Sequence, residues 1–255
     1  MIHVSRAPAA YLVVSILGAG LLSGCAGTPT VPVQKYEPTY TYSAARASRK
    51  ADVTIALVKL QTVGDGTEFK RKSSEDEFVS GFFKRLDGGT NEVLIAKGFG
   101  VTGPFDTLES MSFPEKKGAD FVLFAEFDVK HPYSIQNRRM DSPSMAEALL
   151  GGSAVPACDA VIKAVGQVSF VAVEPLTKEK MWVKRYEVQG VPRTFQGRGE
   201  VCSGLKVTQE IRNGWGRALE DLFSDTMRSL DKYVNVEEFQ MLKQQAVELR
   251  GKKVY

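Results

Sequence analysis

The run ADFVLFAEFDV at residues 119–129 constrains the fold of this chain more than any other feature. Its aliphatic and aromatic residues fill the length of a strand, so the run predicts a strand in a sheet. VTIALVKL at 53–60 is a continuous apolar run of the kind expected for a strand buried on both faces. FGVTGPF at 99–105 predicts a short strand between them. Helices must therefore pack on the sheet that these three strands form.

Helical periodicity fills the intervals between these strands. Residues 74–77 (SEDE) have the spacing of a capping box and predict the start of a helix. Apolar residues then recur three or four positions apart: Phe78, Val79, Phe82, Phe83 and Leu86. The sequence DGG at 87–89 predicts an end or a kink, after which the chain continues helically to a stop at Gly98. A second capping box at 112–115, with Pro114 at the first helical position, predicts a short helix.

The second half of the chain adds a hairpin and two helices. Residues 165–188 are apolar on both sides of the turn PLTKEK, which predicts a β-hairpin. Two stretches, 130–163 and 190–212, show no firm period and are expected to be irregular. Asn213 is expected to cap a helix with a wide apolar face that must be buried. The residues of that face are Trp215, Ala218, Leu219, Leu222, Phe223, Thr226, Met227, Leu230 and Tyr233.

The order of these elements defines the expected fold class. It is α/β with a mixed, α+β type sheet: β-α-β-α-β, followed by a β-hairpin and two C-terminal helices. We expect one α/β domain over 51–234. A C-terminal amphipathic helix in 235–255 is expected to pack on the domain or extend from it.

The first 24 residues have the layout of a secretory signal. Arg6 and the amino terminus give a short positive region, and AAYLVVSILGAGLL is apolar but too short to span a bilayer. LSGC at 22–25 resembles the lipobox of bacterial lipoproteins, in which the cysteine is acylated and becomes the first residue. We expect residues 1–24 to be removed and Cys25 to carry diacylglycerol and an acyl chain. Ala26, in place of an aspartate, implies by the same resemblance the outer membrane.

Residues 25–50 follow the lipobox and are rich in Pro, Thr and Tyr, without helical periodicity. They predict an extended tether, and a polyproline-like chain advances about 3.1 Å per residue. Tyr36, Tyr40 and Tyr42 alternate, so a strand or a partner-binding segment is the alternative interpretation.

Charge and residue content argue against several classes of protein. The formal net charge of +3 is too small to indicate a nucleic-acid partner. His3 lies in the signal, which leaves His131 for any catalytic pair, and no CxxC or HxxxH spacing indicates zinc. The glycines of GFGVTG at 98–103 are not followed by the Gly-Lys-Ser/Thr of a phosphate loop. We therefore expect no enzyme, no metal site and no cofactor beyond the lipid on Cys25.

The two remaining cysteines, Cys158 and Cys202, each lie in a stretch without a clear period. In an oxidising envelope compartment they could form a disulfide that joins two long loops. Two free, buried cysteines are the alternative. The sequence leaves both open.

Two segments carry a resemblance to a known family. GQVSFVAVEPLTKEK at 166–180 and LDKYVNVEEFQMLKQQAVELRGKK at 230–253 resemble the neuraminyllactose-binding haemagglutinin (HpaA) family of surface lipoproteins. The helix, turn and strand run at 94–129 fits that family in order and length, as does the lipobox. The resemblance covers most of the mature chain, and its residues form packing and turn patterns rather than a catalytic signature.

The resemblance implies an outer-membrane lipoprotein of the cell surface or flagellar sheath, with an adhesin role toward sialylated glycans. The family's short basic glycan-binding stretch corresponds to KHPYSIQNRRMDSP at 130–143. Gln136, Arg138 and Arg139 match its character, and Tyr133 could stack on a sugar ring. An arginine can donate two parallel hydrogen bonds to a sialic carboxylate. The family has stronger basic residues where His131-Pro132-Tyr133 stand, and a solvated loop is the alternative interpretation.

The same outline resembles, more loosely, lipoprotein activators of peptidoglycan synthases and the amino-terminal domain of TolB, which bind partner proteins. The alternative function is therefore a periplasm-facing lipoprotein that binds an envelope protein, such as a peptidoglycan synthase or a flagellar component. The sequence specifies neither the leaflet, nor the ligand, nor the oligomeric state.

Overall fold

The computed structural model describes residues 34–72, 76–143 and 145–252. The larger of its two sheets has the order β3-β1-β4-β7-β8, with the short strand β2 beside β4. Its strands are β1 (Thr54–Val58), β2 (Gln61–Thr62), β3 (Gly100–Phe105), β4 (Phe121–Val129), β7 (Val165–Val173) and β8 (Lys180–Gln189). β1 pairs in parallel with β3 and β4, whereas β4, β7 and β8 are antiparallel. The predicted mixed sheet and hairpin are confirmed.

Both faces of the large sheet are covered, because successive residues of a strand point to opposite faces. On one face, Ile55 and Leu57 join the main core with helices α2 (Glu77–Ala96), α6 (Gln209–Tyr233) and α7 (Val236–Lys252). On the other face, Ala56 and Val58 join a smaller core. That second core lies beside α3 (Phe113–Gly118), whose predicted start at Ser112 is confirmed: Glu115 accepts a hydrogen bond from the Ser112 backbone N–H.

Helix α2 is continuous, so the predicted end or kink at 87–89 is wrong. Gly89 instead lets α6 approach closely, because a Cβ there would lie 2.7 Å from the Met227 sulfur. The helix starts at Asp76, whose carboxylate accepts hydrogen bonds from the first turn. The predicted capping serine, Ser74, lies outside the described residues. An additional helix, α1 (Gly64–Lys72), lies between β2 and α2.

The stretches 130–163 and 190–212 were expected to be irregular, and this prediction is wrong. They form a three-stranded antiparallel sheet in the order β5-β6-β9. Its elements are β5 (Tyr133–Asp141), α4 (Met145–Leu149), β6 (Val155–Ile162), β9 (Arg193–Arg198) and α5 (Glu200–Ser203). The exposed edge strand β5 and the short α4 and α5 offer little apolar periodicity. The strands are instead stabilised by pairing with residues far along the chain.

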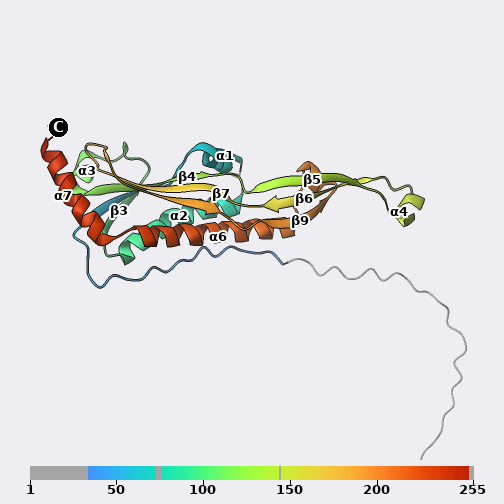
Figure 1. The fold of residues 1–255 in the computed structure, drawn as a ribbon, viewed down its shortest axis with the longest axis horizontal. Helices are drawn as coiled ribbons and strands as arrows, with labels where there is room; N and C mark the ends of the chain where they lie inside the picture. The colour runs from blue at the N-terminus through green and yellow to red at the C-terminus, as the bar shows by residue number, and fades with distance from the viewer. Residues whose placement is uncertain (1–33, 73–75, 144, 253–255) are drawn as a thin grey trace, which may run out of the picture. The chain divides into compact units, whose positions relative to one another are not determined.

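Helix α6 packs against both sheets (Figure 1). Its N-terminal part approaches the small sheet, where a Cβ on Gly214 would lie 2.4 Å from Phe195 and 3.2 Å from Ile162. The predicted apolar face is buried. The predicted cap at Asn213 is wrong, because Thr208, five residues after the end of α5, caps the helix. Among the described residues no helix is both long and apolar enough to cross a bilayer.

Residues 34–50 are extended, but they are not a free tether. They run along α6, where the Asn213 side chain bonds the backbone of Gln34 and Tyr36 at 2.7 and 2.9 Å. Tyr40 is buried in the main core and donates a hydrogen bond to the Phe78 carbonyl at 3.0 Å. Tyr42 bonds Asp231 near the end of the helix. The alternating tyrosines therefore bind this chain's own domain.

Helix α7 packs on the large sheet through buried Phe239 and Ala246, and is fixed at its end by an ion pair. Glu174, in the hairpin turn, is fully buried and accepts from Arg250 at 2.6 Å. Its second carboxylate oxygen accepts from the turn amides of Leu176 and Thr177. Arg250 also donates to the Ala119 carbonyl at 2.8 Å, so one guanidinium joins α7, the hairpin and the start of β4.

Replacing Arg250 with methionine should lower the free energy of unfolding by about 2 kcal/mol, because it leaves the buried Glu174 carboxylate without its cation. Urea unfolding followed by circular dichroism measures the change. The matched control is Arg228→Met, which removes an exposed pair with Asp225 and should cost at most about 0.5 kcal/mol. Equal losses in the two variants would contradict a stabilising role for the Arg250 pair.

Candidate functional site

The predicted glycan-binding stretch forms the edge strand β5, not a loop. A bulge interrupts it, because pairing with β6 passes from Gln136 and Asp159 to Arg139 and Ala157. Asn137, inside the bulge, has a positive φ of 48°. The bulge decides which side chains share a face, since one extra residue reverses the alternation along a strand.

The outer face of the small sheet carries a polar network around Asp159. Asn137 and Gln196 donate hydrogen bonds to its two carboxylate oxygens at 2.7 and 2.9 Å. Arg139 donates to Gln196 at 3.1 Å, and its guanidinium lies 3.8 Å from Asp159. The hydrogen bond from Asn137 is the main factor that lowers the pKa of Asp159, helped by Gln196 and Arg139. Arg139 is thus already paired with carboxylates of its own chain.

Tyr133 does not join this network. It pairs with Ile162, which faces α6, so its ring lies on the opposite face from Gln136 and packs against the main core. Burial raises the pKa of its hydroxyl. Gln136 is exposed and donates to the neighbouring Ser134 hydroxyl at 3.3 Å. The four predicted glycan residues therefore do not converge on one site.

Arg138 lines an open groove of about 750 Å³ beside α5. The other lining residues are Arg139, Met140, Pro156, Gly199, Glu200, Cys202 and Ser203. Arg138 is exposed and forms no ion pair or hydrogen bond with the described part of the chain. It is the one predicted glycan residue whose charge stays available to a ligand.

Cys202, which lines this groove, forms a disulfide with the buried Cys158, with a Cα–Cα distance of 5.6 Å. It fixes α5 to β6, and Gly197 makes room for it, because a Cβ there would lie 2.8 Å from the Cys158 sulfur. The bond also consumes the thiols of Cys158 and Cys202, so neither can act as a nucleophile with His131. No local pattern pointed to Asp159 and Gln196, because they lie 37 residues apart on paired strands.

His131 lies at the junction of the two sheets. Its ring meets Phe69 and Trp215 edge-on, at centroid distances of 5.5 and 5.0 Å. Burial lowers its pKa, which favours the neutral ring, and Nδ1 accepts from the Tyr133 N–H at 3.4 Å. These contacts are those of a packing residue. Within the described ranges, no three potential metal ligands lie close enough to hold an ion.

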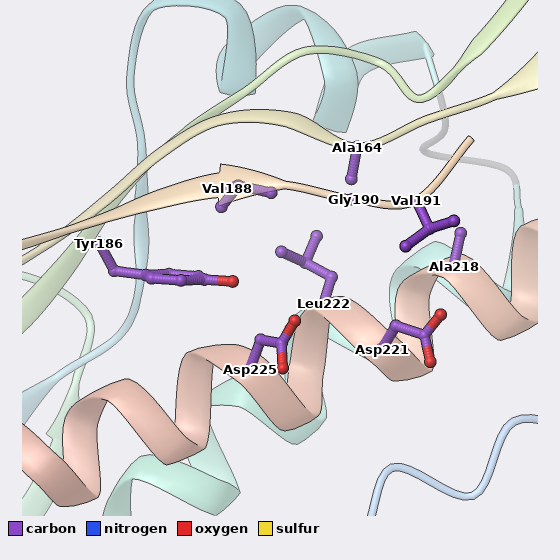
Figure 2. A pocket seen from close by; sticks show the side chains of 9 residues that line it. All are labelled: Ala164, Tyr186, Val188, Gly190, Val191, Ala218, Asp221, Leu222 and Asp225. Carbon is purple, nitrogen blue, oxygen red and sulfur yellow. The ribbon is translucent and has the colours of Figure 1, made fainter.

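A second hollow lies between β8 and α6 (Figure 2). It has a volume of about 20 Å³, which is room for about one water molecule. Tyr186 points along it toward Asp225, and burial, followed by Asp225, raises the pKa of Tyr186 to about 12. Asp221 is paired with Arg193 at 2.6 Å. This hollow is too small for a sugar or a cofactor, whose sites are about 300 Å³ or more.

No protein-family model and no curated protein matches the sequence. Comparison with solved structures does find matches. A neuraminyllactose-binding hemagglutinin homologue from Helicobacter pylori superposes with a TM-score of 0.56 at 13% identity, over 84% of this chain and 100% of that one. A protein from Xanthomonas campestris gives 0.34 at 9% identity, over 83% and 97%. A lipoprotein from Neisseria meningitidis gives 0.25 at 9% identity, over 67% and 97%.

The Helicobacter structure therefore shares the α+β fold of this chain. At 13% identity the likeness extends to the fold alone, and the two lower scores carry no argument. Function has to be argued from the site and from the sequence.

Proposed function

We propose that this chain is an acylated outer-membrane lipoprotein that works by binding another envelope component and not by catalysis. The observation that carries the proposal is the short sequence distance between the lipobox cysteine and the first residue bound to the domain. Cys25 lies outside the described residues, but Gln34, nine residues later, is already bound to α6. Nine extended residues span at most about 30 Å. A lipid on Cys25 would therefore hold the domain close to the bilayer.

The proposed lipid attachment has a direct test. In cells grown with labelled palmitate, the wild-type protein should incorporate label and Cys25→Ser should not, because the thiol is the acceptor. The matched control is Cys158→Ser/Cys202→Ser, which keeps Cys25 and should stay labelled. Label that persists in Cys25→Ser, or is lost only in the double variant, would contradict the anchor.

We propose the cell surface or the flagellar sheath as the location, in line with the sequence resemblance to the haemagglutinin family. The alternative is a domain that faces the periplasm and binds an envelope protein. Protease added to intact cells should digest the domain if it is exposed at the surface, and immunoblotting measures the remaining protein. Digestion only after the outer membrane has been opened would support the periplasmic alternative instead.

A second, finer candidate function is recognition of a sialylated glycan at the groove beside α5. The observation that favours it is the exposed guanidinium of Arg138, which has no partner among the described residues. Glu200 also lines the groove and opposes an anionic ligand, so the glycan would have to place its carboxylate away from it.

Titration with sialyllactose tests this candidate function. Wild-type protein should bind saturably, and Arg138→Ala should weaken binding about tenfold or more, since a charged hydrogen bond is worth about 1.5–3 kcal/mol. Arg139→Ala is the matched control and should change binding much less, because Arg139 is paired with Asp159 and Asp141. The absence of saturable binding by the wild type would exclude the glycan.

A further inference from the structure

The end of the small sheet carries a cluster of exposed apolar side chains, called here the apolar tip. Its members are Met140, Met145, Leu149, Leu150 and Val155, with exposed fractions of 63, 84, 83, 89 and 44%. They belong to one continuous turn of the chain, because α4 connects β5 to β6 where Asp141 pairs with Val155. Large aliphatic residues are usually buried, and a cluster of exposed ones marks an interaction surface.

The N-terminal end of the described chain lies on the same side of the fold as the tip. Gln34 is bound at Asn213, near the start of α6, which packs against Ile162 of β6. From Ile162 to Val155, β6 advances toward the tip by about 23 Å. The nine residues from Cys25 to Gln34 reach at most about 30 Å. The reach of these nine residues is thus comparable with the distance from Ile162 to the tip.

The opposite end of the domain lies farther from Gln34 than the nine residues to Cys25 can span. Helix α6 runs for 25 residues, about 37 Å, from Gln34 toward α7. The tip and α7 lie at opposite ends of the described domain in Figure 1. An anchor at Cys25 is therefore within reach of the small sheet and out of reach of the α7 end.

The chemistry of the tip suits a lipid surface. Its exposed side chains are flexible aliphatic and thioether groups, which can enter the region between headgroups and acyl chains. Arg138 and Arg198 lie just behind them; the guanidinium of Arg198 is 3.6 Å from Asp141, and its side chain is still 77% exposed. Guanidinium groups at that depth can bind lipid phosphates while their stems cover apolar surface.

We propose that the apolar tip inserts into the leaflet that holds the acylated Cys25 and so fixes the orientation of the domain on the membrane. This inference rests on the proposed lipid anchor. The lipid provides attachment, and the tip provides a second contact that leaves α7 and the outer end of the large sheet facing away from the bilayer.

Tryptophan fluorescence of the full lipidated protein tests the proposal. Leu150→Trp reports on the tip, and Met241→Trp, 60% exposed on α7, is the matched control. The native Trp182 and Trp215 are buried and give a constant background. The proteins are reconstituted in vesicles of phosphatidylethanolamine and phosphatidylglycerol, with and without brominated acyl chains. Flotation of the vesicles measures attachment independently.

Leu150→Trp should lose about half of its added emission to the brominated chains, and Met241→Trp almost none. Equal, weak quenching of both variants in protein that floats with the vesicles overturns the tip insertion and leaves the anchor standing. Failure of the wild type to float overturns both. The emission maximum of Leu150→Trp could already be shifted to the blue without vesicles, with no quenching when vesicles are added. That result assigns the tip to a contact between protein molecules and also overturns the proposal. Leu149→Trp gives an independent repeat at a second exposed position.

Discussion

Helix α6 has to bury an apolar face along almost its whole length, and the rest of the fold depends on how it does so. The helix is about 37 Å long, whereas a strand of nine residues is about 30 Å long. The large sheet and α2 cover the C-terminal part, where Phe223 and Met227 meet Gly89. The small sheet covers the N-terminal part at Gly214, so the two sheets share one helix as their common core element.

The sequence predicted those elements whose stability is local or strongly periodic. Strands β1 and β4, the β7–β8 hairpin and the apolar face of α6 all follow from runs or repeats that lie within one segment. The kink at 87–89 was wrongly predicted because glycine can end or bend a helix, but it can also allow a second helix to pack closely. Gly89 serves a close contact between α2 and α6, and such a contact is invisible without the partner helix.

The small sheet and the candidate site could not be predicted for a related reason. Strand β6 pairs with β9, 31 to 41 residues later, and β5 offers mostly polar side chains, so no single segment shows the period of a buried strand. The sequence shows that the stretch 130–143 contains basic residues, but it does not show which of their charges are paired. Arg139 is paired with Asp159 of another strand, whereas its neighbour Arg138 is left exposed by one bulge residue.

The N-terminal segment along α6 also determines how the domain responds to force. Tyr36, Thr39 and Tyr42 bind successive positions of the helix, at Glu220 and Asp231, and the segment runs in the same direction as α6. A pull on the chain before Gln34 therefore acts along the helix axis and loads these contacts in shear, together with the buried ring of Tyr40. No strand edge is peeled open by such a pull, and the mechanical resistance of the domain is concentrated where its N-terminal segment meets α6.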